Sequence, residues 1–270
     1  MKKNLVILII YLLSVIFLFI AQKLVSLEIN NFTLIFLYKY IPNIIPFLII
    51  NNLFVKHIDF KKLSSYLKNA YLLFDILIIL ICIISGIPGS GSLISKLEEE
   101  GIYTSKKSKQ ILYNFSSISI PFIYSITNKN LLLIFILILS STISYLLTNK
   151  ELTTNHIPIK TKDNNLTNSI FTSLSTIYLN TTIIVLISIP IKLLLKDDLI
   201  FLPLSFLETS FPAISLVKSY PIVSYFVMTF TSLSLILQLK NTYRDLYINK
   251  YIKKRLFIAS LTTITYFLFY

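Results

Sequence analysis

Long apolar segments separated by short polar ones run along the whole chain. The main apolar segments cover residues 5–20, 32–55, 70–84, 131–147, 170–191, 220–239 and 256–270. About 20 apolar residues in a helix cross a bilayer, and runs without charge or strict alternation favour helices over strands. The pattern therefore predicts an all-α, polytopic helical membrane protein. The last segment is short for a span, so we expect it to pack inside the bundle or to place flanking charges at the interface.

Several of these segments carry residues that interrupt a helix. Pro42 and Pro46 fall within 32–55, and Pro203, Glu208 and Pro212 fall within 199–217. A proline inside a helix removes one hydrogen bond and clashes with the preceding turn. We expect broken or re-entrant helices at these places.

The strongest interruption is a cluster of small residues at 85–101. It contains every glycine of the chain, together with Pro88: Gly86, Gly89, Gly91 and Gly101. Broken backbone at membrane depth is tolerated only where it is buried in protein or lines a polar cavity. We interpret the cluster as a hairpin that lines such a cavity, with a surface loop between two spans as the alternative.

The residues after this cluster predict two short helices. The first is expected over residues 92–100 and is closed by Gly101, because glycine accepts the left-handed conformation that follows a helix end. The second is capped by Thr104 or Ser105, whose hydroxyls can accept a bond from the first turn. It runs on into a stretch of small and polar residues that ends at Pro121. Such residues suit close helix packing or a polar cavity.

Composition supports a membrane protein and excludes several other classes. Hydrophobic residues make up 55% of the chain and charged residues 14%, against about 25% charged in soluble domains. The net charge of +13 comes from lysines in short loops, which form no continuous basic face for nucleic acid. The single cysteine, Cys82, can form no disulfide within the chain. We predict no cofactor.

No constellation of residues indicates catalysis or metal binding. His57 and His156 have no Cys, Asp or Glu cluster beside them in the sequence, so a metal site is not predicted. No P-loop and no Ser/His/Asp set is present, and we do not expect an enzyme. Asp75, inside an apolar run, is either a functional carboxylate or a solvated one near the end of its span.

The chain aligns with itself at an offset of 115 residues. This offset places the segment 115–119 (FSSIS) on 230–234 (FTSLS), Pro88 on Pro203 and the span 131–148 on 246–263. The resulting division is an N-terminal transmembrane helix at 1–30, a first repeat at 31–148, a polar linker at 149–168 and a second repeat at 169–270. Secondary transporters are commonly built from two such repeats, with broken helices that meet near the bilayer midplane.

The order of motifs resembles that of the YlbJ-type sporulation integral membrane proteins. These belong to the nucleoside-recognition (Gate) superfamily, which is related to concentrative nucleoside transporters. The matching segments are 40–47 (YIPNIIPF), 86–91 (GIPGSG), 114–122 (NFSSISIPF), 207–209 (LET) and 230–238 (FTSLSLILQ). Ser and Thr replace most of the family's glycines in the second half, and Gly89 and Gly91 are shifted against its usual spacing.

The resemblance implies a function and a place for it. It implies two Gate-like repeats and transport of a small anion, namely export of dipicolinic acid from the mother cell towards the developing spore. The place would be the cell membrane, as a multi-pass protein, and in a spore-former the mother-cell-derived outer forespore membrane. A nucleoside-type symporter and a non-transporting membrane scaffold remain the alternatives. The expected partners are the lipid bilayer, the anionic substrate and a coupling proton or cation, and a homo-oligomer stays open.

The repeat and the resemblance together select the candidate substrate-binding residues. They are Gly86, Pro88, Gly89, Ser90, Gly91, Asn114, Ser116, Ser117, Ser119, Glu208, Thr209, Thr231, Ser232, Ser234 and Gln238. Most offer hydroxyl or backbone N–H groups, which suit an anion. Glu208 is the exception, and we interpret it as a protonated acid, a coupling residue or one half of an ion pair.

Overall fold

The fold is that of a bundle of short helices. A computed structural model of the chain describes residues 55, 58–67, 70–87, 89–127, 129–148, 201–207 and 209–269. These residues form helices and the turns between them, and no strand. The helices are α3 (Phe60–Tyr66), α4 (Tyr71–Ser85), α5 (Gly89–Glu99), α6 (Ser105–Phe115), α7 (Ile120–Ile126), α8 (Leu131–Leu147), α11 (Phe201–Ser205), α12 (Ser210–Ser219), α13 (Pro221–Phe230), α14 (Leu233–Thr242) and α15 (Ile248–Phe269). The predicted all-α class is confirmed for this part of the chain.

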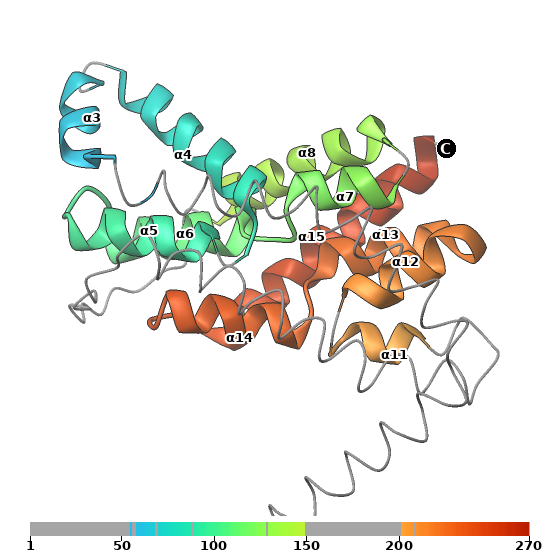
Figure 1. The fold of residues 1–270 in the computed structure, drawn as a ribbon. Coiled ribbons are helices and arrows are strands. Elements are labelled where there is room, and N and C mark those ends of the chain that lie inside the picture. Colours follow the sequence, from blue (N-terminus) through green and yellow to red (C-terminus); the bar gives the residue numbers. More distant parts are fainter. Residues whose placement is uncertain are drawn as a thin grey trace, which may run out of the picture.

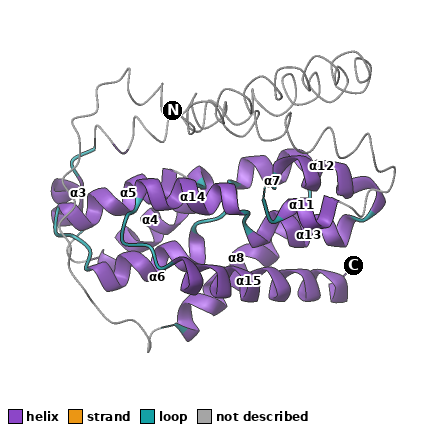
Figure 2. Ribbon diagram, turned by 90° about the horizontal axis from the view of Figure 1, so that it is seen from below, coloured by secondary structure: helices purple, strands orange, loops and turns teal. Residues whose placement is uncertain are grey.

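The helices of residues 60–148 and those of residues 201–269 pack against one another. Helix α15 lies against α13, and also against α6 and α8 from the earlier part of the chain (Figures 1 and 2). Helix α14 packs on α5, and α7 packs on α12. Figure 1 shows α14 alongside α5, with α7, α12 and α13 towards the other end of the bundle. The two parts therefore share one core.

One glycine allows the closest of these contacts. Gly91 lies on α5 where it meets α14, and a Cβ atom there would lie 2.1 Å from the Thr242 hydroxyl oxygen and 2.9 Å from a Leu239 methyl carbon. Only a residue without a side chain fits at such a distance. Gly91 therefore sets the distance between a helix of the first part and a helix of the second.

Polar contacts also join the first part of the chain to the second. They connect α5 and α6 to the turn between α14 and α15. The Lys109 ammonium on α6, which is fully buried, forms an ion pair with Asp245, whose side chain is 14% exposed. The Tyr243 hydroxyl donates to Glu98 at 2.7 Å. Burial and this hydrogen bond raise the pKa of Tyr243, which keeps the hydroxyl protonated as a donor. Breaking a buried pair by removing one partner is strongly destabilising, so these contacts hold the turn in place.

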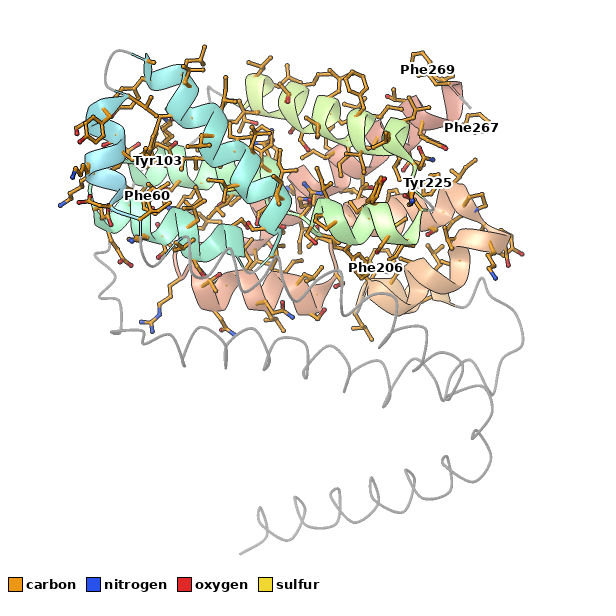
Figure 3. The ribbon with its side chains drawn as sticks, turned by 45° about the horizontal axis from the view of Figure 1, so that its top comes forward. Phe60, Tyr103, Phe206, Tyr225, Phe267 and Phe269 are labelled. Atoms are coloured by element: carbon orange, nitrogen blue, oxygen red, sulfur yellow. The ribbon has the colours of Figure 1, made fainter. Side chains whose placement is uncertain are left out.

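Large apolar side chains cover the outer faces of three helices. Helices α4, α8 and α15 carry them in the exposed positions Leu72, Leu73, Ile76, Leu131, Leu132, Phe135, Leu146, Leu147, Ile264, Phe267, Leu268 and Phe269. Figure 3 shows Phe267 and Phe269 at the end of α15, pointing away from the other helices, whereas Tyr225 lies within the bundle. Among the described residues, one stretch, Pro221–Thr242, is long and apolar enough to cross a membrane. That test uses length and composition alone.

Several sequence predictions about the elements are confirmed. The helix expected at 131–147 is α8 with those bounds. Thr104 caps α6 by accepting a bond from the Lys107 amide, and Gly101 takes a positive φ of 73° after α5. The predicted segments 5–20 and 170–191, residues 32–54 of the segment 32–55, the linker 149–168 and both histidines lie outside the described residues.

Two predictions about where a helix begins were wrong. The helix expected from residue 92 begins at Gly89, so two of the cluster's glycines lie inside it. The last helix begins at Ile248 rather than 256. Its added turns are rich in lysine, and the sequence pattern had assigned them to a loop. The predicted segment 220–239 falls within Pro221–Thr242, the stretch that is long and apolar enough to cross a membrane, and a break at Thr231 and Ser232 divides it into α13 and α14.

The contacts of Gly86 lead to a stability prediction with a matched control. Gly86 and Gly101 both have positive φ, 60° and 73°, which costs an L-residue about 1–2 kcal/mol. A Cβ on Gly86 would also lie 2.5 Å from the backbone nitrogen of Ser119, whereas nothing lies within 4 Å of one on Gly101. Gly86→Ala should therefore lower the melting temperature more than Gly101→Ala does.

Thermal unfolding can be followed with a fluorogenic maleimide, because Cys82 is the only cysteine of the chain and is buried. Equal shifts for the two alanine variants would show that the contact between Gly86 and Ser119 is absent.

Candidate functional site

Two pairs of consecutive helices in the bundle, α6 with α7 and α13 with α14, are separated by short breaks. Helix α6 ends at Phe115 and α7 begins at Ile120, so residues 116–119 form the first break. Pro121, in the first turn of α7, lacks the N–H that would continue the earlier helix. The second break is Thr231 and Ser232, between α13 and α14. Thr231 has a φ of 88°, which is uncommon for a residue with a β-branched side chain and ends α13.

The first break is hydrogen-bonded to the turn between α4 and α5. The Ile87 amide donates to the Ser117 carbonyl at 2.9 Å. The hydroxyls of Ser90 and Ser116 are hydrogen-bonded to each other, and both residues are fully buried. Backbone groups in the break lack the partners that a continuous helix would supply, and buried backbone groups need other partners. The Ile87 amide is such a partner for the Ser117 carbonyl.

The second break is held in the same manner by the turn between α11 and α12. The Leu233 amide donates to the Phe206 carbonyl at 2.7 Å, and the Ser232 amide donates to the Thr209 hydroxyl at 3.1 Å. The Ser232 and Ser234 hydroxyls lie 3.0 Å apart. The first break is therefore hydrogen-bonded to the turn between α4 and α5, and the second break to the turn between α11 and α12.

Two side chains of α15 connect the breaks. The Tyr251 hydroxyl donates to the Ser116 carbonyl at 2.7 Å. The Arg255 guanidinium donates through Nη1 to the Asn114 carbonyl at 3.2 Å and through Nη2 to the Thr229 carbonyl. Arg255 is 1% exposed. The two carbonyls belong to the last turns of α6 and α13, so one cation contacts the C-terminal ends of both interrupted helices.

The electrostatics of this arrangement favour a cation. The last carbonyls of a helix have no intrahelical partner, and they carry the negative end of the helix dipole. A guanidinium placed against two such ends is stabilised by both. We call the two breaks, together with Tyr251 and Arg255, the crossing site.

The structure brings most of the predicted residues together at the crossing site. They come from the two breaks and the turns beside them: Gly86, Ser90, Asn114, Ser116, Ser117, Ser119, Thr209, Thr231, Ser232 and Ser234. Gly89 is the first residue of α5, Gly91 packs against α14, and Gln238 is a buried residue of α14 beyond the second break. Pro88 and Glu208 lie outside the described residues.

The residues that sequence reasoning missed are Arg255, Tyr251 and Thr229. Arg255 stands in a basic segment with Lys250, Lys253 and Lys254 and was therefore assigned to a loop. One signal was present: the chain has 23 lysines and only two arginines. Arginine's planar fork suits buried contacts better than an ammonium group does.

Asp75, the other candidate carboxylate, belongs to a separate cluster. It forms an ion pair with Lys107 at 2.6 Å and accepts a bond from the Tyr103 hydroxyl at 2.8 Å. Burial and this hydrogen bond raise the pKa of Tyr103. The Asp75 side chain is 22% exposed, so the contact joins α4 to α6 at the edge of the bundle. The sequence did not predict the ion pair of Asp75 with Lys107, which joins two helices.

Neither a metal site nor a relative identifies the function directly. In the part of the chain that the structure describes, no group of three His, Cys, Asp or Glu side chains could hold a metal ion. Comparisons of the chain with protein-family models, with curated proteins and with solved structures find no match.

The two breaks allow a paired test of the site. Ser117 and Ser232 are 5% and 0% exposed, so leucine at either position adds volume to closely packed backbone. Overpacking of this kind costs about 1–3 kcal/mol. If the chain transports a small anion, as the resemblance implies, Ser117→Leu and Ser232→Leu should each reduce that transport by more than about tenfold at an unchanged membrane level, since leucine favours insertion.

Ser65→Leu, at an exposed position on α3, is the control and should transport like the wild type. Sensitivity at only one of the two serines would contradict a site built from both breaks.

Proposed function

We propose that the chain is a multi-pass membrane transporter of a small anionic metabolite. The observation that carries the proposal is the crossing site, where two interrupted helices meet a buried cation. Interrupted helices are rare in lipid because their backbone groups must find other partners. Transporters use them to bind substrates near the bilayer midplane.

A membrane setting is supported by the outer surface. Soluble monomers rarely expose large contiguous apolar patches, yet α4, α8 and α15 each present a row of exposed Leu, Ile or Phe side chains. Lipid contact accounts for these rows, and the cell membrane is the proposed location. In a spore-forming source, the resemblance to YlbJ-type proteins favours the outer forespore membrane.

A two-repeat architecture is supported by helix positions and packing. At the offset of 115 residues, α6 falls on 220–230, α7 on 235–241 and α8 on 246–262, which overlap α13, α14 and α15. The contact between α5 and α14 has a counterpart in that between α12 and α7. The turn between α4 and α5 and the turn between α11 and α12 fit this offset less well. The first follows Ser85 and the second follows Ser205, so they are 120 residues apart rather than 115.

The chemistry of the site supports an anion as substrate. Serine hydroxyls, an asparagine amide and a guanidinium surround the breaks, and no described carboxylate bonds to them. The family resemblance adds a specific expectation, dipicolinate, which carries two carboxylates on a planar ring.

Purified protein reconstituted into liposomes tests the proposal. We expect saturable uptake of labelled dipicolinate that protein-free liposomes lack. Uptake of uridine without dipicolinate would favour the nucleoside symporter, and uptake of neither would favour the scaffold. Both outcomes would contradict the proposal.

Glu208 provides a test of coupling. A carboxylate at the centre of a transmembrane helix costs about 2.5–3.5 kcal/mol on insertion-based scales, and a scaffold has no evident use for it. Glu208→Gln should abolish dipicolinate uptake at an unchanged protein level, because the amide cannot release a proton or hold a coupling cation.

Glu100→Gln is the matched control, because Glu100 pairs with Lys96 one helical turn away, near the end of α5, and should retain uptake. Normal transport by a well-expressed Glu208→Gln protein would exclude a coupling role for this residue.

A further inference from the structure

Arg255 has no anionic partner among the described residues. The ion pairs of this part of the chain join Lys96 with Glu100, Lys107 with Asp75 and Lys109 with Asp245. Arg255 instead contacts two neutral carbonyls. Burying a charge is costly unless it is paired and hydrogen-bonded, and two helix ends supply only part of that compensation.

Among the buried polar atoms at this place that lack hydrogen-bond partners, two lie on neighbouring groups. The Nε of Arg255 and the Oδ1 of Asn114 are inaccessible to solvent and form no hydrogen bond within the described protein. They belong to neighbouring groups, because Arg255 already bonds to the Asn114 carbonyl. Buried groups of this kind are normally satisfied. The Nε of Arg255 is a donor, so the group that completes its hydrogen bonding must be an acceptor.

The free edge of the guanidinium has a particular chemical preference. Arginine presents five N–H donors in a fixed plane, and Nε together with a neighbouring nitrogen can bind both oxygens of one carboxylate. The carbonyl contacts occupy Nη1 and one direction of Nη2. The edge that contains Nε is therefore suited to a carboxylate.

We propose that Arg255 is the residue that binds a carboxylate of the transported anion. This assignment rests on the proposed function and specifies its substrate class as a carboxylate. It differs from a structural role, in which the cation only joins the two helix ends. A structural cation would affect all ligands alike, whereas a carboxylate-binding cation affects charged ligands selectively.

The test compares ligands of the same shape but different charge. Full-length protein in detergent is titrated with dipicolinate and with pyridine-2,6-dicarboxamide, its neutral analogue, and binding is read as protection of Cys82 from the maleimide during heating. Wild type should bind dipicolinate more tightly. Arg255→Gln should weaken dipicolinate binding by about ten- to a hundredfold, the loss expected for charged hydrogen bonds, and weaken binding of the dicarboxamide far less.

Arg244→Gln changes the only other arginine, which is exposed, and should bind like the wild type. If Arg255→Gln does not fold, Arg255→Lys keeps the cation but loses the planar fork, and dipicolinate binding should then fall by about tenfold. Unchanged dipicolinate affinity in a folded Arg255 variant overturns the assignment alone. Wild-type protein that does not bind dipicolinate overturns the proposed function and this assignment together.

Discussion

The guanidinium of Arg255 is the contact on which the arrangement of this bundle depends. It joins the C-terminal carbonyls of α6 and α13, which belong to distant parts of the chain. A helix that stops inside a bundle leaves its last carbonyls without partners. One cation that satisfies acceptors at both ends allows both helices to stop at the same place, and Tyr251, one turn earlier on α15, adds a bond to the first break.

Other contacts hold α15 and the neighbouring helices in the positions that allow Arg255 to reach both carbonyls. Gly91 allows α5 and α14 to approach closely. The buried pair of Lys109 with Asp245 fixes the turn before α15 against α6. Because each contact joins the first part of the chain to the second, loss of any one should disturb the crossing site even though none of them lies in it.

The sequence was informative wherever local chemistry decides the structure. Helix α8, the cap at Thr104 and the left-handed Gly101 follow from apolar length, a hydroxyl and a missing Cβ. The residues of both breaks were among those that the 115-residue repeat and the family resemblance selected.

The sequence was uninformative where packing overrides local preference. Nothing local indicates that Thr231 takes a positive φ, because β-branched residues rarely do. Gly91 lies in a helix that glycine disfavours by about 1 kcal/mol, and its reason is a contact with Thr242 in a distant segment. Arg255 resembles its lysine neighbours in charge, and only the fold distinguishes it from them.

The burial of the Arg255 guanidinium between α6 and α13 is tested most directly by the reactivity of the two arginines towards phenylglyoxal, read by mass spectrometry. Arg244 is exposed and Arg255 is 1% exposed. In the folded protein, Arg244 should be modified and Arg255 should react more than about tenfold more slowly, since opening of the bundle must precede modification. In denaturing detergent, the two rates should become equal. Equal rates in the folded protein would contradict a guanidinium buried between α6 and α13.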